Sequence, residues 1–418
     1  MSASTPMSAS ASLNWIVETL WAPPSSVWST DPLRGVRSSE CFAVLPSAAH
    51  PRLLVPLGSR RAAAHALREY TPGKASVRLA KPLLAWGLRS GIARPLLRHR
   101  VHVGVAAEAP IEDLGDVLLK EHLRDVLGRP DLELAVKFDA PRPQRKPILH
   151  LLGHDGRAAG FGKVAWNDVT RALLANETRT LREFPRHTRP PREFVVPKLL
   201  YAGGWRDLEL MIVEPISFGA RRRFLQHPPI AATDEVGQLA GAARMPLRSS
   251  DQWSTMLARI AATHKLNASD PCPRLHEAAQ EIERRHGSVI MTFGSWHGDW
   301  VPWNMAHHNG VLHVWDWERA GGHAARGLDA IHFDYQAELG LRKTAPVPAL
   351  QPTLRRSGNL LGALNVDPAL GVPLLALHLL EMALRFDKAR MAGVATADPK
   401  YLPALEHLLR DTAASAES

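Results

Sequence analysis

The chain has 418 residues, 45% of them hydrophobic, and a formal net charge of +10. This length and composition permit more than one folding unit with a sizeable core. Its two cysteines, Cys41 and Cys272, exclude a disulfide framework and have no metal-binding spacing. They fit a reducing compartment.

The positive charge raises the question of a nucleic-acid partner, because basic surfaces bind polyanions through counterion release. The basic residues are spread widely, however, and their short clusters at 60–61, 142–146 and 221–223 are not interleaved with aromatic residues. We therefore expect a solvated basic surface and no nucleic-acid partner. The alternative is a basic nucleic-acid-binding module, which a steep salt dependence of its affinity for polynucleotides would indicate.

The sequence also bears on location. No uninterrupted apolar run reaches the roughly 18 residues that a bilayer span requires. The first residues, rich in Ser and Ala, lack the basic start and apolar stretch of a signal peptide. We therefore expect no membrane partner and a cytoplasmic location.

The first third of the chain has no recognisable motif. Residues 1–12 are predicted to be a disordered tail, and residues 13–130 an N-terminal extension or cap. Within the extension, the patterns predict short strands and then helices, at 41–45, 53–57, 60–70, 83–98 and 111–127. Its role stays open between a cap, a substrate-specific extension and a regulatory module.

From residue 131 the pattern changes to a meander of strands. Three strands are predicted at 132–138, 147–153 and 157–166, followed by a helix that begins at Asp168 or Thr170. Two more strands follow at 198–202 and 208–215. We therefore predict a small, mainly antiparallel β lobe over residues 131–215. Residues 216–418 read as a larger, mainly helical lobe, strongly so at 372–390 and 402–412.

The helical part contains the most informative pattern in the chain. Asp299 is followed five residues later by Asn304, and Asp316 follows twelve residues after that. Phosphoryl transfer uses one carboxylate to accept the acceptor hydroxyl's proton, and an Asn oxygen with a second carboxylate to hold Mg²⁺ on the nucleotide phosphates. We assign Asp299 as catalytic base, and Asn304 and Asp316 as Mg²⁺ ligands. His297 is expected to support the loop by hydrogen bonding.

The segment H-G-D-x-x-x-x-N followed by D-W-E resembles the aminoglycoside phosphotransferase and choline kinase-like family. Gly298 stands where a protein kinase has Arg, and no A-P-E triplet follows, so we do not expect a protein kinase. Leu328-Asp329 resembles the family's further Asp, which supports the catalytic loop. The resemblance covers residue 132 onward. It implies an α+β, bilobal, protein-kinase-like fold that uses ATP or GTP with Mg²⁺.

The resemblance implies a role for Lys163, which is predicted in an apolar strand on the same face as Phe161. It is similar to the lysine that bridges the nucleotide phosphates and is oriented by an acid of the next helix. Glu177 is the first candidate for that acid and Glu183 the second. The alternative is an edge-strand lysine that extends to water.

Three further residues are predicted to contact the nucleotide. The loop 139–146 has no glycine, so the side chains of Arg145 and Lys146 are candidates to replace backbone amides around phosphate. An ordinary solvated hairpin loop is an equal alternative. The backbone near Val213 is expected to meet the edge of the base, which the sequence does not identify.

The expected acceptor is a hydroxyl group of a small molecule, namely an antibiotic, an amino alcohol or a sugar. A cationic acceptor needs acidic or aromatic groups, for which Glu338, Glu381 and Asp387 are candidates. The alternative is that these acids pair with Arg385 and Arg390. The competing function is a pseudokinase-type nucleotide-binding scaffold without turnover. The oligomeric state is left open.

Overall fold

The protein divides into two compact units. The computed structural model describes residues 9–21, 27–69, 75–107, 112–139, 142, 144–186, 190–216, 224–266, 272–391 and 400–417. The first unit, called the sheet unit below, contains Met1–Thr178 and Pro197–Ala220. The second, called the helical unit, contains Arg179–Val196 and Arg221–Ser418. Each unit is described by itself.

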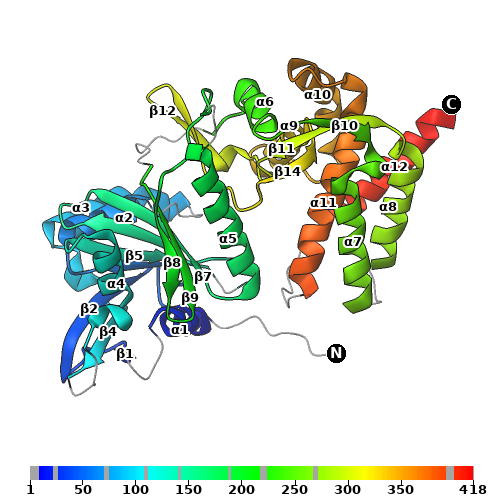
Figure 1. Cartoon of the computed structure of the whole chain (residues 1–418). Helices are drawn as coiled ribbons and strands as arrows, with labels where there is room; N and C mark the ends of the chain where they lie inside the picture. Colours follow the sequence, from blue (N-terminus) through cyan, green and yellow to red (C-terminus); the bar gives the residue numbers. More distant parts are fainter. Residues whose placement is uncertain are drawn as a thin grey trace. The chain divides into compact units, whose positions relative to one another are not determined.

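The sheet unit is built on an antiparallel sheet of nine strands among its described residues, in the order β1-β4-β2-β3-β5-β6-β7-β9-β8 (Figure 1). The strands in chain order are β1 (Val27–Ser29), β2 (Val36–Leu45), β3 (Leu53–Pro56), β4 (Arg100–Ala106), β5 (Leu132–Lys137), β6 (Ile148–Gly153), β7 (Ala158–Ala165), β8 (Leu199–Trp205) and β9 (Leu208–Val213). The antiparallel character predicted for the strands at 131–215 is confirmed.

Helices cover both faces of this sheet. They are α1 (Ala9–Leu20), α2 (Arg60–Glu69), α3 (Ala75–Ser90) and α4 (Leu119–Leu127), and α5 (Asp168–Glu183) follows β7 in the chain. Alternate side chains of a strand point to opposite faces. Accordingly, Phe42 and Val44 of β2 pack in a cluster with α1 and α4, whereas Ala43 and Leu45 pack in a cluster with α2 and α3. The sheet is therefore buried on both sides.

The predicted extension continues the sheet of the small lobe. In β3, Leu53 pairs with Lys137 of β5, and Leu54 pairs with Val136. The boundary predicted at residue 130 therefore falls inside one hydrogen-bonded sheet. Residues 9–12 of the predicted tail belong to α1, whose inner face buries Ile16, Val17 and Leu20. Residues 1–8 lie outside the described residues.

A buried acid in β2 makes stability depend on pH. Glu40 is 6% exposed, neither carboxylate oxygen has a hydrogen-bond partner in the described structure, and Lys120 is 3.9 Å away. Burial, strengthened by nearby Glu121 and Glu133 and opposed by Lys120, raises the pKa of Glu40 to about 7 from 4.5. Between these values the folded protein binds more protons than the unfolded chain, so a rise in pH favours unfolding.

We expect the free energy of unfolding to fall by about 3 kcal/mol between about pH 5 and about pH 8 because of Glu40. Glu40→Gln should remove this part of the pH dependence and be the more stable form above pH 7. Urea denaturation of the wild type and Glu40→Gln across that pH range measures the free energy of unfolding. Glu18→Gln, a substitution of an exposed acid, is the control. Equal slopes for wild type and Glu40→Gln would refute the assignment.

The helical unit surrounds a long central helix. Its helices are α6 (Ile230–Gly237), α7 (Asp251–Leu266), α8 (Cys272–His286), α9 (Leu328–Gly340), α10 (Leu350–Ala363), α11 (Gly371–Met391) and α12 (Tyr401–Glu417). Its strands are β10 (Ala243–Pro246), β11 (Ile290–Trp296), β12 (Met305–His308), β13 (Val311–Val314) and β14 (Gly321–Ala325). The predicted larger, mainly helical lobe is thereby confirmed, and with it the α+β fold class.

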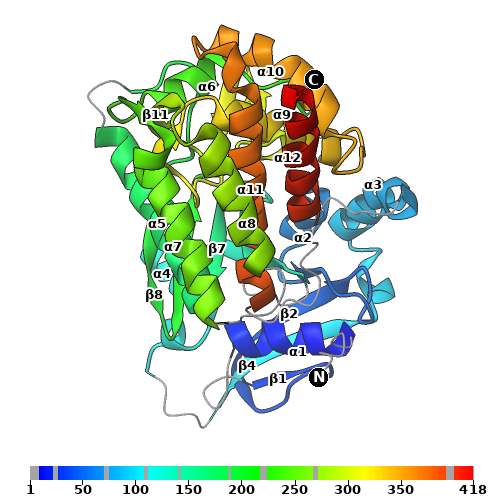
Figure 2. The same ribbon diagram turned by 90° about the vertical axis from the view of Figure 1, so that its right-hand side faces the viewer.

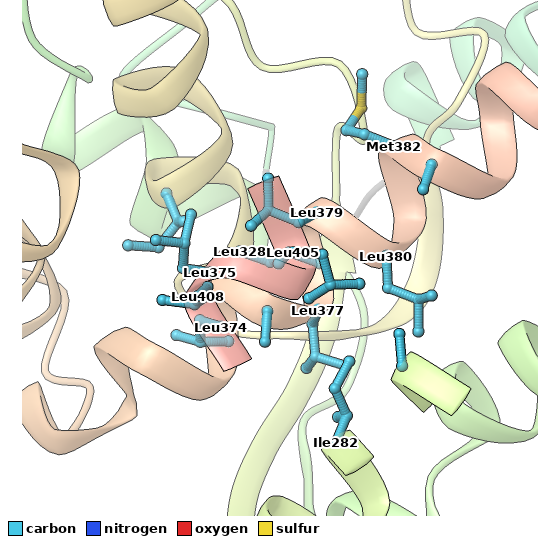
Figure 3. Close-up of a cluster of buried hydrophobic side chains, with 14 of the residues drawn as sticks. Ile282, Leu328, Leu374, Leu375, Leu377, Leu379, Leu380, Met382, Leu405 and Leu408 are labelled. Atoms are coloured by element: carbon cyan, nitrogen blue, oxygen red, sulfur yellow. The ribbon is translucent and has the colours of Figure 1, made fainter. Parts of the chain in front are cut away.

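Helix α11 is the core of this unit. It packs against α8, α9 and α12, and α8, α11 and α12 run side by side (Figure 2). Figure 3 shows Leu377 of α11 beside Ile282 of α8, within a cluster that includes Leu405 and Leu408 of α12. Residues 368–386 are long and apolar enough to cross a membrane, but 83% of that segment is buried inside the protein. Its apolar surface is therefore used for packing.

Candidate active site

In the sheet unit, Lys163 of β7 meets an acid of α5. The Lys163 Nζ lies 2.8 Å from Oε1 and 2.6 Å from Oε2 of Glu177, whose side chain is only 4% exposed. Helix α5 begins at an Asn167 cap, where Oδ1 accepts the backbone N–H of Thr170 at 2.9 Å. Glu183, the second candidate, pairs with Arg179 at 3.1 Å instead. A half-buried lysine held by a carboxylate in this way has a fixed position, as the predicted contact with phosphate would need.

The other residues predicted on the nucleotide side lie in the same unit. Arg145 forms an ion pair with Asp139, and its carbonyl accepts the indole N–H of Trp166 at 2.8 Å. Its charge is thus already paired in this loop, while 140, 141 and 143 lie outside the described residues. Val213 ends β9 opposite Phe161 of β7. The contacts of Arg145, Lys146 and Val213 with a nucleotide stay predictions.

In the helical unit, His297 follows β11 and is fully buried. Its Nδ1 accepts the backbone N–H of Asp299 at 3.1 Å, and its Nε2–H donates to the carbonyl oxygen of Trp315 at 3.1 Å. These two bonds specify one neutral tautomer. Burial lowers the pKa of His297 despite the nearby Asp329 and Asp299 carboxylates. With both ring nitrogens engaged by backbone, His297 fixes the loop and is not placed to exchange protons with an acceptor.

Asp329 holds the same loop from helix α9. Its carboxylate accepts the backbone N–H of His297 at 2.7 Å and that of Gly298 at 3.1 Å. Gly298 has φ +78°, and a Cβ atom there would lie 2.4 Å from the carbonyl oxygen of Arg319. The glycine where a protein kinase has Arg is therefore required by the backbone here. Leu328-Asp329 has the loop-supporting position that the resemblance implied.

The carboxylate of Asp299 has a polar side chain on each side. Its Oδ2 accepts the side-chain amide of Asn304 at 2.8 Å, and its Oδ1 lies 3.4 Å from Nε2 of His332. Burial would raise the pKa of Asp299, but the hydrogen bond and charge of His332, together with Arg385 and His297, hold the pKa well below its usual range. The side chain stays 29% exposed, so an acceptor can reach an ionised carboxylate.

Asn304 links this carboxylate to the segment that carries Asp316. Its backbone carbonyl accepts the N–H of Trp315 at 3.0 Å, and the next residue, Asp316, has the left-handed φ of +70°. A non-glycine residue in that conformation is uncommon and is found at functional sites. Because Nδ2 of Asn304 donates to Asp299, its Oδ1 is the atom left for a cation. Asn304 Oδ1 and the Asp316 carboxylate are oxygen ligands of the kind that Mg²⁺ prefers.

Three features of the site were not predicted. Trp317 of the D-W-E triplet is 1% exposed and packs 4.4 Å from His297 and 5.7 Å from Phe194, ring centroid to centroid. Arg385 of α11 donates to the carbonyl oxygen of Gly298 at 2.8 Å. His332 reaches Asp299 from α9. Arg385 belongs to a segment predicted to be helical, but the sequence contained no signal of these contacts between distant residues.

The acids proposed for a cationic acceptor are paired with arginines. Glu381 binds Arg385 at 2.7 Å and Arg259 at 2.5 Å. Glu338 binds Arg356 at 2.5 Å and Arg342 at 3.3 Å. The pairing of Glu381 with Arg385 is the alternative that the sequence left open. The side chains of Asp387 and Arg390 lie outside the described residues.

Comparison with known proteins gives similarities to solved structures. The sequence matches no protein-family profile and no curated protein sequence. One similar structure is an apo thermostable mutant of aminoglycoside phosphotransferase APH(4)-Ia, with 14% identity, a TM-score of 0.49, and coverage of 70% of this chain and 99% of that one. Another is amicoumacin kinase hAmiN, with 13% identity, a TM-score of 0.44, and coverage of 67% and 88%.

A third similar structure is a putative fructosamine-3-kinase from Haemophilus somnus 129PT, with 11% identity, a TM-score of 0.45, and coverage of 70% of this chain and 96% of that one. All three are phosphotransferases or kinases of small molecules, the class to which the catalytic-loop motif is similar.

Proposed function

We propose that this protein is a phosphotransferase that moves the terminal phosphate of ATP or GTP to a hydroxyl group of a small molecule. The observation that carries the proposal is the arrangement around Asn304. Its amide nitrogen holds the carboxylate of Asp299, and its backbone holds the segment of Asp316. Asn304 thus connects the candidate base, Asp299, to the segment of the candidate cation ligand, Asp316, as phosphoryl transfer requires.

Asp299 is the proposed catalytic base. It orients the acceptor hydroxyl and takes its proton late in the transfer, so a carboxylate with a low pKa suffices. His297 contributes by holding the loop through the backbone of Asp299 and Trp315. Arg385 holds the same loop at the carbonyl oxygen of Gly298.

Candidate residues for the nucleotide are proposed in each unit separately. Asn304 Oδ1 and Asp316 would hold Mg²⁺, which neutralises charge on the phosphates when bound. Lys163, oriented by Glu177, is proposed to bind the phosphates, with the backbone near Val213 at the base. Arg145 and Lys146 are further candidates for phosphate contact.

The proposed acceptors are an antibiotic, an amino alcohol or a sugar. Glu338 and Glu381 are not assigned to a cationic acceptor, because both are bound to arginines. We also propose a cytoplasmic location, where the nucleotide is available. The competing pseudokinase function would require nucleotide binding without turnover, and a scaffold has no chemical use for the placement of Asp299.

Calorimetric titration with ATP and GTP, with and without Mg²⁺, tests the proposal. We expect Mg²⁺-dependent binding by the wild type and a loss of affinity of more than about tenfold in Asp316→Ala, because a carboxylate ligand is removed. Asp251→Ala, which removes an exposed acid of the same unit, should bind as the wild type does. A folded protein that binds neither nucleotide would contradict the proposal. Binding without phosphate transfer to any acceptor would favour the pseudokinase.

A further inference from the structure

A pair of buried histidines lies behind the carboxylate of Asp299. His332 of α9 is 3% exposed, and His378 of α11 is 2% exposed. Their Nδ1 atoms are 3.2 Å apart, and the ring centroids are 4.9 Å apart. On its other side, His332 places Nε2 at 3.4 Å from Oδ1 of Asp299. The functional site described above uses neither ring for chemistry.

The geometry assigns one hydrogen of this pair, that on Nε2 of His332. Nε2 of His332 faces a carboxylate, so it carries hydrogen, because a lone pair there would be repelled. The two Nδ1 atoms then share one hydrogen, which one ring donates to the other. Burial, with the positive charge of Arg385, lowers the pKa of His378 well below its usual value, which agrees with a neutral ring.

This arrangement ends inside the protein. Nε2 of His378 has no hydrogen-bond partner among the described residues. A proton passed inward from Asp299 would therefore have no route out through His378. The pair is built to hold an orientation, because the Nδ1 contact with His378 keeps the ring of His332 with Nε2 toward Asp299.

We propose that His332 is a positioning residue that fixes the plane of the Asp299 carboxylate for phosphoryl transfer. Asn304 holds Oδ2 at 2.8 Å, and Nε2 of His332, a buried atom with no hydrogen bond in the described structure, faces Oδ1 at 3.4 Å, so the two groups together limit rotation of the carboxylate. The distance of 3.4 Å is long for a hydrogen bond. Contacts of this kind in free enzymes often shorten when substrate binds. This inference rests on the proposed role of Asp299 as base.

Two amide substitutions of His332 separate positioning from packing. The amide nitrogen of Gln corresponds to Nε2 of His, and that of Asn corresponds to Nδ1. His332→Gln therefore keeps a donor toward Asp299, whereas His332→Asn keeps only the contact toward His378. Both bury an amide, and they differ by one methylene group. Phe333→Leu, a fully buried change on the same helix, is the control for lost core volume.

The measurement is the release of phosphate from Mg²⁺-ATP and Mg²⁺-GTP with water as acceptor, together with calorimetric Kd values. His332→Asn should lower kcat about 10- to 100-fold with an unchanged nucleotide Kd, because small misplacements of a reacting group cost that much. His332→Gln should stay within about threefold of the wild type on the same scale. Equal kcat values for the two variants would overturn the positioning role.

A second measurement does not depend on turnover. Ring ¹⁵N spectra of histidine-labelled protein, with His332 assigned from its absence in His332→Gln, report protonation of Nε2. We expect Nε2–H in the wild type and a shift of that resonance in Asp299→Asn. An unprotonated Nε2 of His332, or an Nε2 resonance that does not shift in Asp299→Asn, would overturn the inference. A wild type without turnover or nucleotide binding would contradict the proposed function alone, since the spectra still decide the contact.

Discussion

Replacement of Asp299 by Asn should reduce phosphate transfer by about 10²- to 10⁴-fold, the range that a positioned general base contributes. The amide has nearly the same shape, and its oxygen can still accept the N–H of Asn304, so the loop should stay intact. It cannot take the proton of an acceptor hydroxyl. The affinity for the Mg²⁺-nucleotide should be unchanged, because Asp299 is not assigned to the nucleotide or the cation.

Turnover and nucleotide Kd should be measured together on wild type and Asp299→Asn, with Asp251→Asn as the matched amide substitution of an exposed acid. If Asp299→Asn retains full transfer activity, another group must be the base and the assignment of this loop fails. If it also loses nucleotide binding, the residue acts on the fold or the cation instead. Only a loss of kcat alone agrees with the proposed role.

Removal of the Asp329 carboxylate is expected to have the largest effect on stability. Asp329→Ala would leave two buried backbone donors, the N–H groups of His297 and Gly298, without an acceptor. Each such group costs about 1–3 kcal/mol. Burial raises the pKa of Asp329, so loss of this buried charge offsets part of the cost. We expect a net loss of about 2–5 kcal/mol, a large part of the stability of an ordinary domain.

Chemical denaturation measures this loss, and Asp367→Ala supplies the matched control. Asp367 accepts one backbone N–H, that of Ala369 at 2.9 Å, at an exposed position. Water can replace it, so we expect a loss of less than about 1 kcal/mol there. Similar losses in the two variants would contradict the role of Asp329 as the buried anchor of the loop.

The sequence predicted what is local or chemically constrained. The spacing of Asp299, Asn304 and Asp316 predicted a loop that carries all three, and the structure places Asn304 in contact with Asp299 and with the backbone before Asp316. The two-residue period of a strand predicted on which face of its strand Lys163 lies. The choice between Glu177 and Glu183 needed the rotation of α5, which depends on where the Asn167 cap starts the helix.

What the sequence did not predict is contact between distant segments. Strand β4 pairs with β2, so that Val101 lies opposite Phe42, and nothing within either segment encodes that partner. His332 and His378 read as members of helices, and only the packing of α9 on α11 brings the rings together. Pro82 predicted a helix start near residue 83, but α3 begins at Ala75 and continues through the proline.

The pairing of β3 with β5 has a practical consequence for anyone who shortens this chain. Five of the six residues of β5 are buried, and Val136 and Lys137 align with β3. A fragment that starts near residue 131, where the recognisable motifs begin, would expose a hydrophobic strand edge with unpaired backbone groups. Such edges recruit other chains and lead to aggregation. The first 130 residues are therefore part of what keeps the remainder of this sheet from self-association.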